Sequence, residues 1–193
     1  MESIDNIICH QSVLKKNIIT LRRIFIEENS SEIIDKSVCT EQTCRLLCLS
    51  VINNSTANPK IMKSEMGTIV EQVGNKTECA LLEMAFEMGY DYKELRQKDK
   101  QKKTFPFSPE KKKMCTVYED DKGKNYVFVK GAPYLLLPSC SRYINKHGTI
   151  SKIDSDFSNY INSMILDFAT QSLGTLLLAY KEVNEVPGSW EEV

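Results

Sequence analysis

The stretch KKMCTVYEDDKGKNYVFVK, residues 112–130, contains two strand-like runs separated by a turn. Residues 112–119 and 124–130 are rich in β-branched and aromatic side chains, which favour strands. The Asp-Asp-Lys-Gly sequence at 120–123 is typical of a tight turn. The stretch therefore predicts a β-hairpin, and the two strands of a hairpin run antiparallel.

Helical patterns flank this hairpin on both sides. Apolar residues recur at helical spacing over residues 40–52, after Asn75 and from about Asp154. Gly89 offers a stop for the second helix and Gly174 for the third. Because helices and strands are grouped along the chain without strict alternation, we expect an α+β fold in which an antiparallel β-sheet is flanked by helices.

The other segments carry less regular patterns. Residues 91–103 are polar and predict a helix or a loop, while Pro133 predicts the start of a short helix whose length Pro138 limits. Residues 175–183 predict a buried strand. We expect a single domain over 1–193, made of an N-terminal hinge-side segment over 1–38 without a clean period, a core over 39–183 and an exit segment over 184–193.

The composition excludes several classes of protein. Of the 193 residues 41% are hydrophobic and the net charge is −1, so the chain can bury a core but has no overall positive field for nucleic acid or anionic lipid. No apolar run approaches the roughly 18 residues of a membrane helix, and residues 1–5 lack the positive charge of a secretory signal. The seven cysteines form no C-x-x-C pair, which indicates reduced, buried thiols of a cytosolic protein and no metal site.

Familiar catalytic motifs are missing from the chain. We find no phosphate-binding glycine loop, dinucleotide fingerprint, nucleophile elbow or paired-histidine motif, so we expect no catalytic residue here. Three short segments nevertheless occur in a fixed order, namely GNKTECALL at 74–82, FPFSPEKKKM at 105–114 and VKGAP at 129–133. Together they resemble the nucleotide-binding (N) domain of P-type ATPases.

The resemblance extends over residues 39–190, and two stretches make it more specific. QVGNKTECALL at 72–82 and the segment 173–180, which ends in Leu-Ala-Tyr, look like plasma-membrane-type calcium-transporting ATPases. The chain has neither the Asp-Lys-Thr-Gly-Thr motif nor the Thr-Gly-Glu loop on which the family's pump cycle depends. The resemblance therefore implies the nucleotide-binding module of a larger ATP-driven ion translocase.

This resemblance also implies the ligand, the partners and the location. The module would bind ATP, with Mg²⁺ carried by the nucleotide, and would not turn it over alone. The γ-phosphate would pass to an aspartate on a separate phosphorylation domain. Its partners would be ATP and the phosphorylation and actuator domains of the same chain, on the cytosolic face of a membrane. We expect a monomer without nucleic-acid contact or direct membrane contact, and calcium is implied as the transported ion.

Two residues match the family's needs for an adenine ring. Phe107 would supply a stacking surface worth about 1–3 kcal/mol per base. Glu78, in the first turn of its helix, would accept a hydrogen bond from the exocyclic amino group. Without the resemblance, Phe107 would be interpreted as a core aromatic residue and Glu78 as an acid that interacts favourably with the helix dipole.

The lysine triplet at 111–113 would by itself indicate a solvated charged face. In an extended strand the middle lysine, Lys112, points away from both neighbours. The resemblance places Lys112 at the family's nucleotide-contacting lysine, with Met114 on the same face as an apolar side of the adenine pocket.

Lys130 lies on an apolar strand face, where an ammonium group needs a partner or a path to solvent. In the family this lysine lies deep in the nucleotide pocket, and the glycine at Gly131 allows the backbone to approach closely. The resemblance adds four further candidates for nucleotide contact: Thr77, Ser108, Ala132 and Leu176.

The sequence departs from the family pattern at two positions. Gly174 stands where related calcium pumps carry an arginine that contacts the ATP phosphates, and Tyr134 stands where the family usually has a glutamate. A lost charge-assisted contact is worth about 1.5–3 kcal/mol. We therefore expect weak binding, with a dissociation constant on the order of 0.1 mM to several mM, and similar affinities for ATP and AMP.

Two other functions stay open. The departures at Gly174 and Tyr134 are compatible with a degenerate N domain that acts as a protein-interaction module with little ATP binding. Nucleic-acid binding through the lysine-rich stretch 98–113, with Phe105 and Phe107 as stacking groups, is the second alternative, although the overall charge argues against it.

Overall fold

The structure is a computed structural model that describes residues 6–15, 18–26, 29–31, 39–65, 67–96, 100–145 and 147–192. Before residue 39 it describes the course of the backbone. The strands are β1 (Asn6–Lys15), β2 (Ile18–Ile26), β3 (Asn29–Ser31), β4 (Lys60–Ser64), β5 (Gly67–Glu71), β6 (Gln101–Ser108), β7 (Lys113–Glu119), β8 (Asn125–Gly131), β9 (Arg142–Ile144), β10 (Ile150–Lys152) and β11 (Gly174–Val183). The helices are α1 (Glu41–Asn53), α2 (Lys76–Glu87), α3 (Tyr92–Leu95), α4 (Pro133–Leu136) and α5 (Ser155–Thr170), with 3₁₀ turns η3 (Leu137–Ser139) and η4 (Trp190–Glu192).

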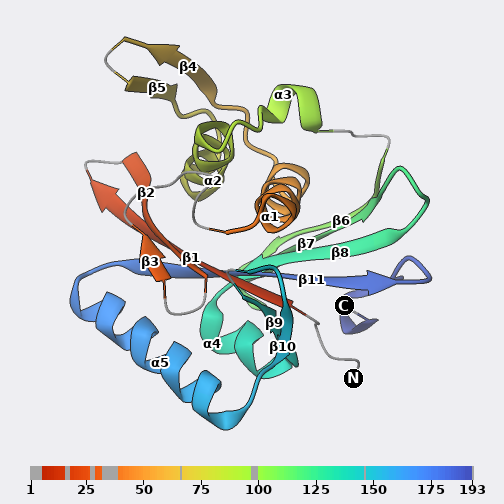
Figure 1. Cartoon of the computed structure of the whole chain (residues 1–193). Helices are drawn as coiled ribbons and strands as arrows, with labels where there is room; N and C mark the ends of the chain where they lie inside the picture. The colour runs from red at the N-terminus through yellow and green to blue at the C-terminus, as the bar shows by residue number, and fades with distance from the viewer. Residues whose placement is uncertain are drawn as a thin grey trace.

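One twisted sheet forms the centre of the molecule (Figure 1). Its strand order is β10-β9-β1-β11-β8-β7-β6, and β2 and β3 continue from β1. Neighbouring strands are antiparallel, apart from a single parallel pairing of Ile7 in β1 with Tyr143 in β9. The predicted hairpin over 112–130 is confirmed, because β7 and β8 pair in register from Lys113 opposite Gly131 to Glu119 opposite Asn125.

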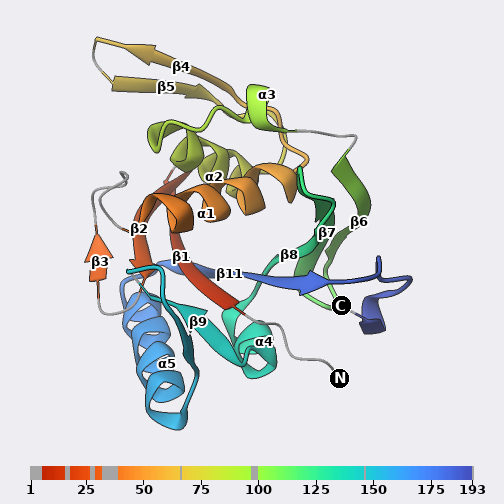
Figure 2. The same cartoon turned by 45° about the vertical axis from the view of Figure 1, so that its right-hand side comes forward.

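The helices form two layers on opposite faces of this sheet. Helices α1 and α2 cover one face, with the β4–β5 hairpin above them, and α4 and α5 lie on the other face (Figures 1 and 2). Successive side chains of β11 point to opposite faces of the sheet, so this strand contributes to a hydrophobic core on each face. Leu178 packs with residues of α1 and α2, while Leu177 and Ala179 pack with residues of α4 and α5. The predicted α+β fold with an antiparallel sheet flanked by helices is therefore confirmed.

Capping side chains set the starts of the three long helices as the sequence predicts. The Thr40 side chain accepts a hydrogen bond from the Thr43 amide at the start of α1. In the same way, Asn75 accepts from the Glu78 amide at α2, and Asp154 accepts from the Phe157 amide at α5. Gly89 follows α2 with a φ of 81°, which fits its predicted role as a helix stop. Local sequence therefore determines these helix boundaries.

Two local predictions differ from the structure in this part of the chain, and one hairpin was not predicted. Residues 101–103 belong to strand β6, because they pair with β7, and do not continue the polar helix or loop predicted over 91–103. The hairpin formed by β4 and β5 follows no pattern that we recognised. Lys112 lies in the turn between β6 and β7 with a φ of 46°, so the prediction that strand alternation orients it opposite to its neighbours is wrong.

Helix α5 ends at Thr170, four residues before Gly174, so the prediction that Gly174 ends this helix is wrong. The left-handed residue is Ser172, with a φ of 59°. The Leu173 amide donates to Phe168 O at 3.0 Å and the Ser172 amide to Ala169 O at 3.0 Å, which is the Schellman pattern. Gly174 is instead the first residue of β11, so it does not act as the helix C-terminal glycine.

Replacing Ser172 by glycine should stabilise the domain. A non-glycine residue in the left-handed region carries a steric cost, and glycine removes it at the price of a larger backbone entropy in the unfolded chain. We expect Ser172→Gly to raise the free energy of unfolding by about 0.5–1 kcal/mol, measured by urea denaturation. A decrease in stability would contradict the left-handed assignment.

The predicted burial of the cysteines is confirmed for most of those that are described. The six whose side chains are described form no disulfide with one another, and five of them are buried: Cys44, Cys48, Cys79, Cys115 and Cys140. Burial raises the pKa of Cys115 to about 12, so this thiol stays protonated at neutral pH. Cys9 lies among the residues of which only the backbone is described.

Candidate functional site

One pocket of about 460 Å³ opens where four separate segments of the chain converge. The start of α2, the turn between β6 and β7, the end of β8 and the start of β11 each contribute to its wall. The volume lies in the range of small-ligand sites. Its lining residues are Asn75, Thr77, Glu78, Phe107, Pro109, Lys112, Lys130, Gly131, Ala132, Thr175 and Leu176.

Eight of the ten residues that the sequence predicts for nucleotide contact line this pocket: Thr77, Glu78, Phe107, Lys112, Lys130, Gly131, Ala132 and Leu176. Met114 and Ser108 are not among the described lining residues. Met114 is buried and pairs with Lys130 across β7 and β8, while the Ser108 hydroxyl accepts from the Lys111 amide at 3.1 Å. The sequence analysis did not single out three of the lining residues, Asn75, Pro109 and Thr175.

Phe107 forms an exposed edge of the pocket. It lies near the end of β6, and 57% of its surface is accessible, which is unusual for a large apolar side chain on a strand. Phe105, two residues earlier, is buried and packs against Trp190 in a tilted arrangement, with ring centroids 5.1 Å apart. The core interpretation therefore applies to Phe105, and Phe107 is free to contact a ligand.

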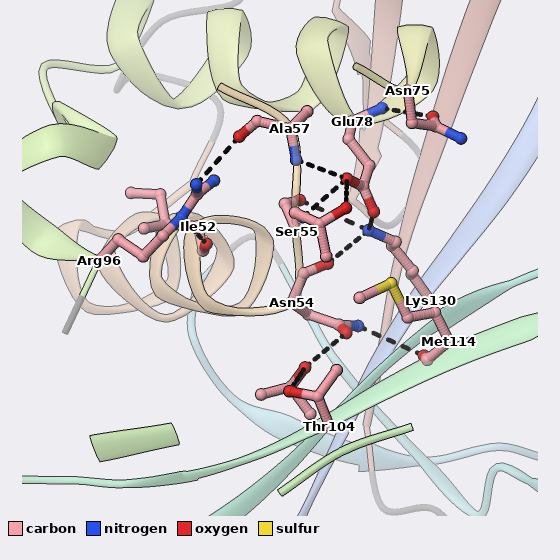
Figure 3. Close-up of polar contacts among 12 residues, drawn as sticks. Ile52, Asn54, Ser55, Ala57, Asn75, Glu78, Arg96, Thr104, Met114 and Lys130 are labelled. Atoms are coloured by element: carbon pink, nitrogen blue, oxygen red, sulfur yellow. Dashed lines mark hydrogen bonds and ion pairs between the residues drawn. The ribbon is translucent and has the colours of Figure 1, made fainter. Parts of the chain in front are cut away.

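A buried ion pair forms the inner wall of the pocket (Figure 3). Lys130 Nζ lies 2.6 Å from Glu78 Oε1, and the two residues are only 7% and 5% exposed. The remaining protons of the ammonium group go to the backbone oxygen of Asn54 and, at 3.4 Å, to the Ser55 hydroxyl. Because an ammonium group has three N–H donors, all of those of Lys130 are engaged within the protein.

The second carboxylate oxygen of Glu78 is held by the loop that follows α1. Glu78 Oε2 accepts from the Thr56 amide at 2.7 Å, the Thr56 hydroxyl at 3.1 Å and the Ala57 amide at 2.9 Å. Hydrogen bonds to the charged form of a carboxylate stabilise that form. The loop over 54–57 therefore fixes the orientation of Glu78 at the pocket wall.

Two residues outside the pocket support this loop. Asn54 donates to Met114 O at 3.3 Å and accepts from the Thr116 hydroxyl at 3.0 Å, which ties the loop to β7. Arg96 donates to Ile52 O at 3.1 Å and to Ala57 O at 2.9 Å (Figure 3). Sequence reasoning missed both residues, because nothing in the local pattern links positions that are 39 or more residues apart.

Opposing influences act on the pKa of each member of the Glu78–Lys130 pair. Burial by itself raises the pKa of Glu78, but the charge of Lys130 and the hydrogen bonds from Lys130, Thr56 and Ala57 outweigh it, and the pKa lies below its ordinary value of 4.5. Burial lowers the pKa of Lys130, and the carboxylate of Glu78 opposes that shift. The predicted need of Lys130 for an anionic partner is thus met by another residue that the sequence predicts for the same site.

Lys112 contributes a second ammonium group to the pocket, in a different environment from that of Lys130. Its side chain is exposed, and its Nζ lies 2.8 Å from the Tyr134 hydroxyl. Among the described residues, no carboxylate forms an ion pair with it. The pocket therefore combines one neutralised lysine at its wall with one uncompensated lysine at its mouth.

Gly131 allows the end of β8 to pack closely against the start of β7. A Cβ atom at this position would lie 2.6 Å from Lys112 O and 2.9 Å from Lys113 Cβ. The Ala132 amide donates to Lys112 O at 3.1 Å, so the backbone there has little room to move. The close approach thus involves the turn that carries Lys112.

Gly131→Ala should destabilise the domain markedly. Overpacking against backbone atoms costs about 1–3 kcal/mol, which corresponds to a fall of about 2–12 °C in Tm for a chain of this size. Thermal unfolding followed by circular dichroism measures the effect. A Tm within 1 °C of the wild-type value would contradict the close packing, because about 2 °C is the smallest shift expected.

The pocket offers little to a metal ion by itself. Among the described residues that line it, Glu78 is the single carboxylate, and both of its oxygens already accept hydrogen bonds. The described part of the chain contains no group of three His, Cys, Asp or Glu residues arranged to hold a metal. Any Mg²⁺ at this site would therefore be held by a ligand's own oxygens.

The fold is that of an α+β domain whose described part contains a pocket of the size of a small-ligand site. The family model described as P-type ATPase, cytoplasmic domain N, matches residues 42–192. The chain belongs to the P-type ATPase family and corresponds to its N domain. The resemblance seen in the sequence motifs is thereby confirmed.

Curated relatives agree with this assignment. The chain is 30% identical to calcium-transporting ATPase 10, plasma membrane-type, of Oryza sativa over 91% of its own length. It is 32% identical to calcium-transporting ATPase 2, plasma membrane-type, of Arabidopsis thaliana over 77%, and 33% identical to plasma membrane calcium-transporting ATPase 4 of Bos taurus over 72%. The chain spans 17%, 14% and 12% of the length of these relatives, which are much longer proteins. Within the described residues, no helix is both long and apolar enough to cross a bilayer.

Proposed function

We propose that this N domain binds the adenosine part of ATP in the pocket described above, with Mg²⁺ carried by the nucleotide. The observation that carries the proposal is the convergence of Phe107, Lys112 and the Glu78–Lys130 pair on one cavity of about 460 Å³. These residues come from separate segments of the chain, so their convergence is a property of the fold. An exposed aromatic ring beside fixed polar groups is the arrangement that a nucleobase requires.

Glu78 and Phe107 would recognise the base. Glu78 Oε2 already accepts three hydrogen bonds, whereas Oε1 accepts from Lys130 alone. Oε1 therefore has more remaining capacity than Oε2 to accept a hydrogen bond from an amino group. Lys130 has no free N–H, so it orients Glu78 and does not itself donate to the ligand.

In the whole protein, this domain would present the γ-phosphate to an aspartate on a separate phosphorylation domain. Phosphoryl transfer depends mainly on positioning and electrostatic stabilisation, so a binding domain contributes to the rate without supplying a nucleophile. The names of the relatives support calcium as the transported ion. We further propose that residues 1–193 act as one domain, as a monomer on the cytosolic face of a membrane, whose partners are the phosphorylation and actuator domains of the same protein.

Thermal unfolding with added nucleotide tests ATP binding. With a dissociation constant of about 1 mM, 10 mM ATP stabilises the folded state by about 1.4 kcal/mol, which raises Tm by about 3–6 °C. AMP should act similarly, and inorganic triphosphate at the same ionic strength should raise Tm less than either nucleotide. If saturating ATP leaves Tm unchanged, the proposal is wrong and a protein-interaction module is favoured.

A further inference from the structure

The backbone of Lys112 is held rigidly at the mouth of the pocket. Its φ of 46° is in the left-handed region, which is unusual for a residue with a long side chain. Its amide donates to Ser108 O at 2.6 Å, and its carbonyl accepts from the Ala132 amide at 3.1 Å. Residues in strained backbone conformations accumulate at functional sites.

Tyr134 fixes the other end of this side chain. It lies in the first turn of α4 and is 58% exposed, so its position does not depend on burial in a core. Its hydroxyl lies 2.8 Å from Lys112 Nζ, and the ammonium group is 5.5 Å from the centre of its ring. Since a phenol oxygen lies about 2.8 Å from the centre of its ring, the two distances place the ammonium group beyond the hydroxyl and not over the ring face, so the hydrogen bond alone fixes the location of the charge.

The side chain at position 134 determines whether the positive charge of Lys112 is available to attract an anionic ligand. A phenol is neutral, so it orients the ammonium group without cancelling its charge. It also occupies only one of the three N–H donors of Lys112, whereas the donors of Lys130 are all engaged within the protein. A carboxylate at position 134 would neutralise Lys112 and would compete with an anionic ligand.

We propose that Tyr134 is a positioning residue that holds the Lys112 ammonium group ready for the phosphate of a nucleotide. This inference rests on the proposed function, because it concerns the same pocket. It attributes the binding affinity gained from the phosphate to the Lys112–Tyr134 pair, whereas Phe107 and Glu78 recognise the base.

Calorimetric titration with adenosine and with AMP, which differ by one phosphate, tests this role. We expect wild-type protein to bind AMP about 5- to 10-fold more tightly than adenosine, which is within the range of one ordinary hydrogen bond, because water weakens the contact of the exposed Lys112 ammonium group. Tyr134→Phe should reduce this ratio about threefold, and Tyr134→Glu should abolish it, while adenosine affinity stays within about twofold. Tyr160→Phe, on exposed α5 away from the pocket, is the matched control and should change neither affinity.

A double variant distinguishes positioning from an independent contact. Lys112→Met should also abolish the ratio, and adding Tyr134→Phe to it should have no further effect, because Tyr134 acts through Lys112. Additive losses, or an equal loss of adenosine and AMP affinity in Tyr134→Phe, would overturn the inference. Equal wild-type affinity for adenosine and AMP would also overturn it and leave the proposed function intact, whereas absence of any adenosine binding would overturn both.

Discussion

Lys130→Met should destabilise the domain by about 3–5 kcal/mol, the usual effect of leaving one partner of a buried ion pair uncompensated. The substitution keeps the length of the side chain, so the lost volume is small. It leaves the Glu78 carboxylate, which is 5% exposed, without the ammonium group 2.6 Å away. Because domains are stable by about 5–15 kcal/mol in total, urea denaturation should reveal this loss clearly.

The pH dependence of stability should change sign in this variant. In the wild-type protein the pKa of Glu78 lies below 4.5, so its contribution is fully present above pH 4.5 and is lost as the pH falls through the folded-state pKa. In Lys130→Met, burial would raise that pKa above 4.5, so protonation would relieve the buried charge and acidification toward pH 4.5 would stabilise the variant relative to neutral pH. Stability curves between pH 4.5 and 7 measure the difference.

Two further variants separate the buried charge from the loss of a side chain. Combining Lys130→Met with Glu78→Gln removes both charges and should recover most of the stability. Lys124→Met removes an exposed lysine that pairs with Glu182, and we expect no comparable loss, because water screens that pair. If Lys130→Met and Lys124→Met have equal effects, the buried pair does not stabilise the fold as argued.

Phe107→Ala should weaken adenosine and ATP binding about 5- to 150-fold, which corresponds to the loss of one stacked base contact of about 1–3 kcal/mol. The ring is 57% exposed, so the free energy of unfolding should change little. Adenosine and ATP should lose affinity by the same factor, because the ring contacts the base. Calorimetry or amide chemical shifts of the pocket residues measure the affinity.

Conservative and distant substitutions sharpen this test. Phe107→Trp retains a flat aromatic surface and should preserve most of the affinity, whereas Tyr160→Ala on α5 should leave it unchanged. Unchanged affinity in Phe107→Ala would show that nucleotide binds elsewhere or without stacking. A loss confined to ATP would place Phe107 near the phosphates and contradict its assignment to the base.

Much of the fold was predictable because its signals are local. Caps at Thr40, Asn75 and Asp154 start the long helices, and the Asp-Asp-Lys-Gly turn pairs β7 with β8. The order of three short motifs predicted both the family and most of the residues that line the pocket. Each cap, turn and motif is a pattern of about a dozen residues or fewer, and the order of the motifs is itself part of the sequence, so the sequence was sufficient.

Positions that depend on contacts between distant segments were not predictable. Alternation along a strand gave the wrong orientation for Lys112, because this residue is the last of the turn before β7 and its backbone packs against Gly131. The stop of α5 lies at Ser172, where hydrogen bonds to the last turn compensate for a conformation that a glycine would adopt more easily. In both cases packing or hydrogen bonding overrode the local propensity.

The amino-acid sequence by itself determined the α+β class, the helix starts and the family, together with the residue types that a nucleotide pocket needs. Only the tertiary structure showed that Glu78 and Lys130 form one buried pair and that Asn54, Thr56 and Arg96 hold it in place. The physical reason is that the partners of a buried charge are chosen by proximity in space. A lysine 52 residues from its carboxylate has no local signal that names the partner.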